Sequence, residues 1–130
     1  MTIDQTRAII ESYAAGHDPQ YLAEDAVFTD LTSGQTHEGR DAVAGMLHHV
    51  YHVAFDARAE EVSLTVGEGR ATLEAVFVGR HIGDFAGIPA TGREVRVPLS
   101  VSYDIAKDGI KRARIYMLAS VMMQQLGVAN

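Results

Sequence analysis

The sequence contains no cysteine among its 130 residues. Disulfide bonds and thiolate chemistry are therefore excluded, and cysteine usage says nothing about the compartment. Long apolar runs are also missing, because no stretch approaches the roughly 20 residues that a membrane-spanning helix needs. The opening residues MTIDQTRAIIES carry acidic side chains early and lack the apolar segment of a signal peptide. We therefore expect a soluble cytoplasmic protein that does not contact a membrane.

Positive charge is scarce, with 11 lysines and arginines against 17 acidic residues and a formal net charge of −6. Nucleic-acid phosphates attract clustered Lys and Arg, so this balance argues against a nucleic-acid partner. Hydrophobic residues, by contrast, make up 47% of the chain. A domain of this size buries roughly two-thirds of its unfolded surface. Since the sequence has no internal repeat or linker, residues 1–130 are expected to form one domain.

The first half of the sequence predicts three helices. Thr2 and Gln5 have the spacing of a capping box, which marks the start of a helix. Asp18-Pro19 is typical of an N-cap followed by proline at the first helical position. These and the apolar periodicities give a helix that stops at Gly16, a short helix to about Ala23, a strand over 26–30, a loop over 32–39 and a helix over 41–54.

The third predicted helix carries two histidines, His48 and His52, one turn apart on the face opposite its apolar stripe. That spacing is able to hold a metal ion. No third ligand lies nearby in the sequence, however, and no HExxH pattern is present. The preferred interpretation is therefore a solvated pair and no metal site.

The second half predicts a meander of four long strands. Their apolar residues recur with strand periodicity, and Asp108-Gly109 between the last two is a strong signal for a two-residue hairpin turn. A short helix follows them. The strands are expected over 61–66, 71–80, 95–105 and 110–119, and the helix over 121–126. Helices that precede an antiparallel meander predict an α+β fold with a pocket between the two layers.

The stretch HIGDFAGIPATGREV, residues 81–95, joins two of these strands and is dense in glycine. Together with the alternating valines after it, the Asp-Gly turn and a terminal Gln-Leu-Gly, it resembles the SnoaL-like polyketide cyclases of the nuclear-transport-factor-two-like superfamily. AEDAVFTD and SGQTHEGRDAV in the first half fit the same family. The matching positions are Gly79, His81, Gly83, Phe85, Gly87, Ile88, Pro89, Thr91, Gly92, Val95, Asp108, Gly109, Tyr116, Gln125, Leu126 and Gly127.

The resemblance implies a cone-shaped curved antiparallel sheet packed against three N-terminal helices, a cystatin-like or SnoaL-like α+β barrel. It further implies a cavity for a hydrophobic small molecule such as a polyketide, no cofactor, and a homodimer built sheet to sheet. In the family, a carboxylate near the end of the last long strand removes a proton next to a carbonyl. Here that position holds Leu118, a second acidic position holds Ile115, and no Asp or Glu follows Asp108. The usual catalytic Asp is thus missing.

The predicted hairpin decides which side chains face the cavity. A turn at Asp108-Gly109 places Tyr103 opposite Arg114, and it also pairs the next inward-facing residues of the two strands. We expect this mostly apolar face to line the cavity; the alternative is the opposite face, with Ser100, Ser102 and Asp104. The candidate ligand-binding residues are then Tyr13, Phe28, Phe85, Tyr103, Arg114, Tyr116 and Leu118.

Three residues are candidates for a relocated catalytic base. His81 ends a predicted strand, and an imidazole with a reference pKa near 6.5 suits a base or a ligand contact. Its alternative role is structural, with the ring holding the glycine-rich loop. Asp30 lies where cone folds often point a residue at the ligand, and burial beside an aromatic ring would raise the basicity of Asp30 or Asp84. Each aspartate equally fits a solvated turn.

Three functions remain open from the sequence. The first is a cofactor-free cyclase, isomerase or lyase that acts on a hydrophobic oxygenated small molecule with a relocated base. The second is a non-catalytic binding protein that uses the same cavity for an apolar small molecule. The third is a dimerisation module without a ligand. The fold supports many reactions, so the site has to distinguish these functions.

Overall fold

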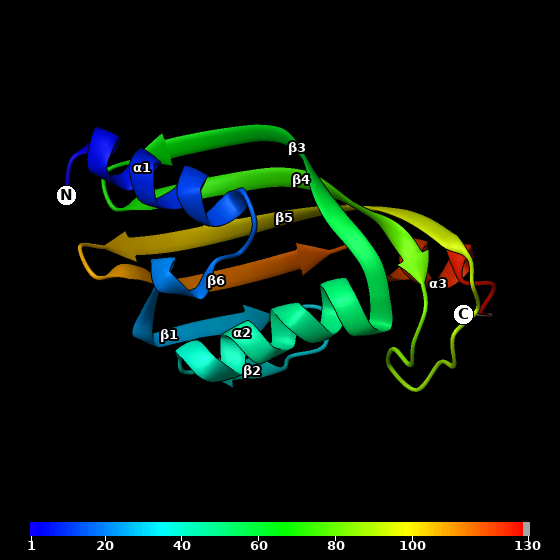
Figure 1. The fold of residues 1–130 in the computed structure, drawn as a ribbon. Coiled ribbons are helices and arrows are strands. Elements are labelled where there is room, and N and C mark those ends of the chain that lie inside the picture. The colour runs from blue at the N-terminus through cyan, green and yellow to red at the C-terminus, as the bar shows by residue number, and fades with distance from the viewer. Residues whose placement is uncertain (129–130) are drawn as a thin grey trace.

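The computed structural model describes residues 1–128, so the last two residues of the predicted domain lie outside it. A six-stranded sheet with the strand order β2-β1-β6-β5-β4-β3 forms one layer. The first two α-helices lie against one face of this curved sheet, and the last lies at the end where the long strands bend (Figure 1). The predicted α+β class is confirmed.

The helices follow the predicted order. Helix α1 spans Ile3–Ala14, and its capping box is formed as expected: the Thr2 hydroxyl accepts from the Gln5 N–H, and the Gln5 side chain accepts from the Thr2 N–H. The second helix is only a 3₁₀ turn. The third continues from α-helix into a π-helix. The remaining elements are η1 (Pro19–Tyr21), α2 (Arg40–His48), η2 (His49–Ala54) and α3 (Ala119–Gln125).

The strand at one edge of the sheet is longer than predicted, and the other edge has a strand that was not predicted. They are β1 (Leu22–Asp30), β2 (Thr36–Glu38), β3 (Phe55–Gly67), β4 (Arg70–His81), β5 (Glu94–Ala106) and β6 (Gly109–Met117). The predicted loop over 32–39 contains β2, and β3 begins six residues before its predicted start. Both are edge strands, whose exposed side chains weaken the apolar alternation on which the prediction depends.

The sheet is mixed rather than wholly antiparallel. The meander β3-β4-β5-β6 is antiparallel as predicted, but β1 pairs in parallel with β6. The two strands are far apart in the sequence, so local periodicity carries no sign of this pairing. Because β2 and β3 are the two ends of the strand order, the sheet curves without closing into a barrel.

The predicted register of the last hairpin is wrong. Ala106 pairs with Gly109, so the two turn residues are Lys107 and Asp108, and a bulge after Asp104 shifts the strands again. Gly109 has another role, because it holds φ 125° and a Cβ there would lie 2.6 Å from the carbonyl oxygen of Tyr21. The glycine therefore allows close approach of two chain segments and does not form the turn.

The corrected register reverses the faces of β6. Tyr103 pairs with Ala113, not with Arg114, and Arg114 pairs with Ser102 on the outer face. There its guanidinium forms an ion pair with Asp104 at 3.2 Å. The side chains of Tyr116 and Leu118 are 49% and 53% exposed. Arg114, Tyr116 and Leu118 thus lie on the side of the sheet opposite Tyr103. The expectation that they share one face with it is wrong. The moved turn alone shifts the partner of Tyr103 by two residues and keeps the face, whereas the bulge after Asp104 shifts it back by one residue and reverses the face.

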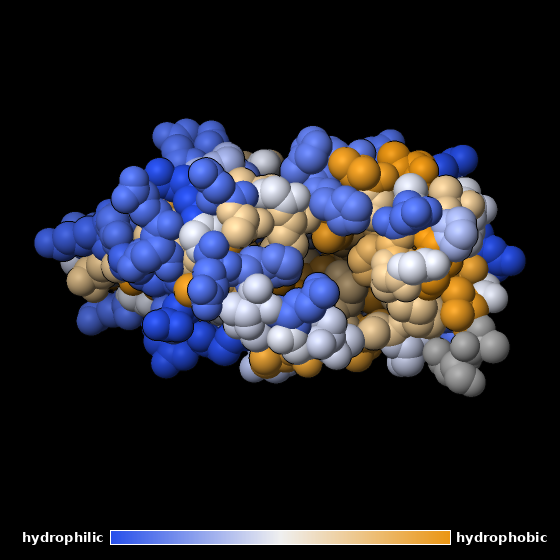
Figure 2. Space-filling view, turned by 90° about the horizontal axis from the view of Figure 1, so that it is seen from below, coloured by the Kyte–Doolittle hydropathy of each residue, from blue (hydrophilic) through white to orange (hydrophobic). Residues whose placement is uncertain are grey.

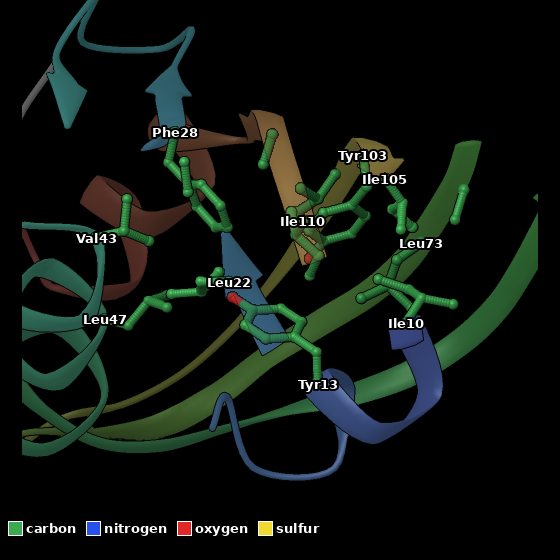
Figure 3. Packing of buried hydrophobic residues seen from close by; sticks show 14 of the residues in the cluster. Ile10, Tyr13, Leu22, Phe28, Val43, Leu47, Leu73, Tyr103, Ile105 and Ile110 are labelled. Carbon is green, nitrogen blue, oxygen red and sulfur yellow. The ribbon is translucent and has the colours of Figure 1, made fainter. Parts of the chain in front are cut away.

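Two apolar clusters fill the space between the sheet and the helices. The larger one lies between α1, α2 and the end of the sheet that carries the β3-β4 and β5-β6 turns. Figure 3 shows Tyr13, Phe28 and Tyr103 entering it from three elements. The smaller one lies where α3 packs on β5, with Phe55 and Phe77 at its centre. Tyr51 and Leu99 pack against both clusters and mark the seam between them.

Candidate functional site

Three tyrosines from separate elements converge in the interior. Tyr13 comes from α1, Tyr51 from the π-helix η2 and Tyr103 from β5. Tyr13 and Tyr103 are 1% and 4% exposed, and their rings meet edge to face with centroids 6.0 Å apart. In Figure 3 the ring of Tyr13 reaches from α1 toward Leu22 and Leu47, across the space that Phe28 and Tyr103 enter from the sheet. The interior of the cone therefore contains a group of phenols.

Burial keeps these phenols protonated. Loss of solvation raises the pKa of Tyr13 well above its usual value, and the neighbouring phenols of Tyr103 and Tyr51 raise it further. Burial also raises the pKa of Tyr51 to about 12. The pKa of Tyr103 is raised by burial first and by Tyr51 second. Because none of the three ionises near neutral pH, each offers an O–H donor inside an apolar enclosure.

The three hydroxyls make no hydrogen bond to another protein group among residues 1–128. A fully enclosed polar atom without a partner would be costly, and within this part of the chain only Nε2 of His81 is one. Each tyrosine hydroxyl therefore keeps a small surface that a water molecule can touch. A few polar groups placed among apolar side chains are typical of a ligand pocket.

Aromatic rings connect the tyrosines to the rest of the interior. The chain of contacts runs from Phe28 through Tyr103, Tyr13, His17 and Tyr51 to Phe77 and Phe55, with neighbouring centroids 4.7–6.4 Å apart. Such spacings are typical of favourable aromatic pairs. The series of rings crosses the boundary between the two clusters. A flat apolar ligand that took the place of one ring would therefore contact the neighbouring ring.

Asp30 is on the inner face of the sheet. It ends β1 and pairs with Ile115 of β6, two residues beyond the pair of Phe28 and Ala113 in the larger cluster. Its side chain is half-buried, and its Oδ1 accepts the backbone N–H of Thr32 at 2.9 Å. That bond holds the carboxylate in position and leaves its second oxygen without a protein partner in residues 1–128. Of the three predicted bases, Asp30 alone combines a free acceptor with a place on the inner face.

His81 lies completely inside the protein. Its Nδ1 accepts the backbone N–H of Thr91 at 3.1 Å, and the Thr91 hydroxyl lies 3.0 Å from the same atom. An acceptor at Nδ1 fixes the proton of the neutral ring on Nε2, which has no partner in the described chain. The ring also stacks on Phe55 with centroids 5.0 Å apart. These contacts join the two ends of the glycine-rich loop.

Asp84 and Phe85 lie on that loop. Asp84 is exposed, whereas the half-buried ring of Phe85 contacts Phe55 at 5.1 Å between centroids. Phe85 and Ile88 bridge each other through backbone hydrogen bonds and form a short turn over the smaller cluster. Gly83 is required in the loop because a Cβ there would overlap the carbonyl oxygen of Val53. The loop thus closes one end of the interior.

The surface formed by residues 1–128 includes two shallow depressions and a hollow. A depression of about 300 Å³ on the outer face is bordered by Pro98, Tyr116 and Leu118, and one of about 390 Å³ lies beside Met1 and Gly69. Neither depression reaches Tyr13, Tyr51 or Tyr103. Figure 2 shows a hollow right of the centre, edged by apolar side chains on the side of α3. Inner-face residues that pack on the clusters yet stay half-buried are Val50, Tyr51, Leu99, Ile115 and Met117.

The paired histidines do not form part of a metal site in residues 1–128. The rings of His48 and His52 lie 5.5 Å apart, and both side chains are exposed. Within the described part of the chain, no three His, Cys, Asp or Glu side chains are grouped to hold a metal ion. None of the helices in it has the length and apolar character that crossing a membrane requires.

The family assignment comes from sequence comparison. The family model of the SnoaL-like polyketide cyclases matches residues 4–126, nearly the whole chain. The chain therefore belongs to the SnoaL-like polyketide cyclase family, as its motifs indicated. No curated protein matches the sequence.

Solved structures confirm the fold. A Jannaschia sp. CCS1 protein classed with the SnoaL-like polyketide cyclases has a TM-score of 0.84 at 17% identity, with 99% of this chain and 96% of that one covered. AclR of Streptomyces galilaeus, described as a hydroxylase, has a TM-score of 0.78 at 19% identity and 97% and 83% coverage. A Catenulispora acidiphila protein with a ketosteroid isomerase-like fold, crystallised with trimethylamine, has a TM-score of 0.77 at 20% identity, with 95% of each chain covered.

Two residues of the aromatic series were not predicted from the sequence. Tyr51 lies in a segment that reads as ordinary α-helix, and the apolar stripe of that helix was assigned without it. His17 follows Gly16 in what reads as a plain helix stop. Only the residue types could have indicated Tyr51 and His17. The segments YHVAF and GHDP place aromatic or imidazole rings at the ends of helices that cover the sheet. A π-turn and a left-handed residue cannot be recognised from periodicity.

Proposed function

We propose that this chain is a cofactor-free enzyme that binds a hydrophobic, oxygenated small molecule such as a polyketide in the interior of the cone and moves a proton next to a carbonyl. The observation that carries the proposal is the convergence of three protonated tyrosines in an aromatic enclosure. Neutral O–H donors in a weakly polar site stabilise the oxygen of an enolate as charge develops on it. The enclosure itself favours a flat apolar substrate.

Asp30 supplies the base in this proposal. Its unpaired oxygen takes a proton from the carbon beside the carbonyl, the C–H electrons form the enolate double bond, and a phenol such as Tyr13 hydrogen-bonds to the enolate oxygen. The enolate carbon then attacks an electrophilic carbon or takes a proton back. No electron acceptor is needed for either outcome, which agrees with a reaction without a cofactor. Asp84 is exposed, and Nδ1 of His81 already accepts from Thr91, so both are placed less favourably.

The relocation of the acid is supported by the inner face of β6. The side chains that β6 presents to the interior are Ala113, Ile115 and Met117, none of which can accept a proton. Leu118, which the resemblance was expected to align with the family's acid, is exposed on the outer face. Asp30 lies beside Ile115 across the parallel strand pair, so its carboxylate can serve the same region of the interior.

The test is proton exchange, because it does not require the natural substrate. Wild-type protein is mixed with the probe 2-tetralone in D₂O, and deuterium uptake next to the carbonyl is followed by NMR. We expect uptake above the uncatalysed rate, a loss of at least tenfold in Asp30→Asn, and a smaller loss in Tyr13→Phe. Asp84→Asn is the matched control and should exchange like wild type. Equal exchange in Asp30→Asn and wild type would remove Asp30 from the mechanism.

The alternative is a binding protein without catalysis. It is favoured by the same apolar inner face of β6, which keeps a ligand site but lacks the acid usual in the family. Ligand-dependent thermal stabilisation by 2-naphthol, a stable mimic of an enol, would appear in both cases. Stabilisation together with background-level deuterium uptake in the wild type would favour the binding protein.

A further inference from the structure

A histidine with a strained backbone stands beside the tyrosines. Helix α1 ends with the N–H of His17 bonded to the carbonyl of Tyr13 at 2.7 Å, and His17 has φ 57°. That left-handed conformation costs most residues about 1–2 kcal/mol and is normally taken by glycine or asparagine. Gly16 is directly adjacent and does not have a positive φ. The chain therefore places an imidazole at the one position of this turn where glycine would be easier.

A second irregularity meets the first. The π-helix η2, a rare element that is frequent at functional sites, carries Tyr51, and the rings of Tyr51 and His17 lie 4.7 Å apart. The ring of His17 also lies near Tyr13, with centroids 5.2 Å apart. Strained backbone is retained where the surrounding structure needs the side chain in one place. Here a left-handed residue and a π-helix, far apart in sequence, meet in one contact.

The imidazole of His17 is free to bind a ligand. Its nitrogens make no hydrogen bond or ion pair with a protein group in residues 1–128, and neither is a fully enclosed atom. Burial lowers the pKa of His17, and the neighbouring His52 lowers it further, so the ring is neutral near pH 7. The groups that face it are Tyr13, Tyr51 and His52, and no carboxylate of residues 1–128 pairs with it. A neutral imidazole without a partner has one lone pair that can accept a hydrogen bond.

We propose that His17 is a specificity-determining residue at the edge of the tyrosine group, where its free nitrogen accepts a hydrogen bond from a hydroxyl of the ligand. The tyrosines donate and so select a carbonyl oxygen, whereas His17 accepts and so selects an O–H. The site therefore prefers a ligand with a hydroxyl and a carbonyl over the same ketone without the hydroxyl. This inference rests on the proposed function, because it assumes that the ligand occupies the tyrosine-lined interior.

The experiment compares two matched fluorescent probes, 6-acetyl-2-naphthol and 2-acetylnaphthalene, which differ only in the hydroxyl. Wild-type protein at pH 7 should bind the hydroxylated probe about fivefold more tightly, the effect of one neutral hydrogen bond. His17→Phe keeps the ring contacts and should bind both probes equally. His17→Asn keeps an acceptor and tolerates a positive φ, so it should recover part of the preference. His52→Phe is the neighbouring control and should behave like wild type.

The outcomes separate this inference from the proposed function. Equal affinity of wild type for the two probes, or an unchanged preference in His17→Phe, overturns the role of His17 and leaves the tyrosine site intact. Failure of both probes to bind wild type overturns the interior site and this inference together. Each variant's unfolding midpoint is measured in parallel, and His17→Asn keeps the test decisive if His17→Phe does not fold.

Discussion

Met117 at the end of β6 and Leu118 directly after it make the sharpest prediction, because the same charge should cost very different amounts of stability at the two positions. Leu118 is 53% exposed, so about half of its side chain is already in water. Full burial of such a side chain is worth about 1.5–3 kcal/mol, and Leu118→Asp should therefore cost about 1 kcal/mol or less. The half-buried Met117 packs against the cluster around Phe55 and Phe77. Met117→Asp loses that packing and places a carboxylate in apolar surroundings, at a cost of about 3–5 kcal/mol.

The assay is thermal and urea unfolding at pH 7. For a chain of this length, 1 kcal/mol shifts Tm by roughly 4 °C. Leu118→Asp should thus lower Tm by at most about 4 °C and Met117→Asp by about 12–20 °C. Met117→Leu, which conserves volume, should cost less than about 1.5 kcal/mol. Measurements at two protein concentrations identify a dimer that covers Leu118, because the midpoint would then depend on concentration.

The pH dependence provides the second half of this test. Burial should raise the pKa of the carboxyl introduced by Met117→Asp above the value of about 3.9 in the unfolded chain. The folded variant then binds its proton more tightly than the unfolded one, so its deficit against wild type should shrink as the pH falls from 7 toward 4. Leu118→Asp should show no such recovery. A larger loss in Leu118→Asp than in Met117→Asp would refute the hairpin register.

Three further predictions concern the helices' ends and the loop. Because burial lowers the pKa of His17 below its ordinary 6.5, the unfolded chain takes up that proton first, and wild-type stability should fall below about pH 6.5; His17→Phe should remove this part of the slope in urea unfolding at pH 5 and 7. Gly83→Ala introduces a Cβ that overlaps a carbonyl of η2 and should cost about 2 kcal/mol, whereas Gly16→Ala, with open space around it, should be neutral or stabilising by about 0.5–1 kcal/mol. His81→Asn places its amide oxygen near the position of Nδ1, where it can accept the Thr91 N–H, whereas the amide oxygen of His81→Gln lies one bond further out. The Asn variant should be about 1 kcal/mol more stable than the Gln variant; equal midpoints would show that this bond is dispensable.

The parts of the fold that depend on local signals could be predicted. The capping box of Thr2 and Gln5 and the apolar faces of β4 and β5 were recognised correctly, because each depends on residues close in sequence. The first part of β3 and the whole of β2 were missed, since an edge strand exposes side chains on both sides. The parallel pairing of β1 with β6 has no local signature at all.

The site was harder to predict than the fold. Tyr13, Phe28 and Tyr103 were expected in the interior and lie there. Arg114, Tyr116 and Leu118 were placed on the wrong face, because the sequence gives no sign of the bulge between Asp104 and Ile105. A bulge of one residue reverses the face of every side chain beyond it, since the alternation has a period of two. His17 and Tyr51 depend on backbone irregularities that no pattern of residue types shows.

The parallel pairing of β1 with β6 lets an acidic residue on either strand serve the same region of the interior. Asp30 and Ile115 are Cα partners on the inner face, and neighbouring strands lie only about 4.8 Å apart. A carboxylate on either strand can therefore reach the same bound atom with a small change of rotamer. If Asp30 is the base, Asp30→Asn should abolish deuterium exchange, and adding Ile115→Asp to that variant should restore part of it.

The transfer of the acid from position 30 to position 115 has a matched control, and one outcome would contradict it. Tyr116→Asp in the Asp30→Asn background adds the same charge one residue further, where the side chain is 49% exposed on the outer face, and should restore nothing. Ile115→Asp alone should lose stability, because two carboxylates side by side repel each other, and the Asp30→Asn change should relieve that loss. Recovery with Tyr116→Asp but not with Ile115→Asp would contradict both the register and the assignment of Asp30, because only the inner face leads to the tyrosines.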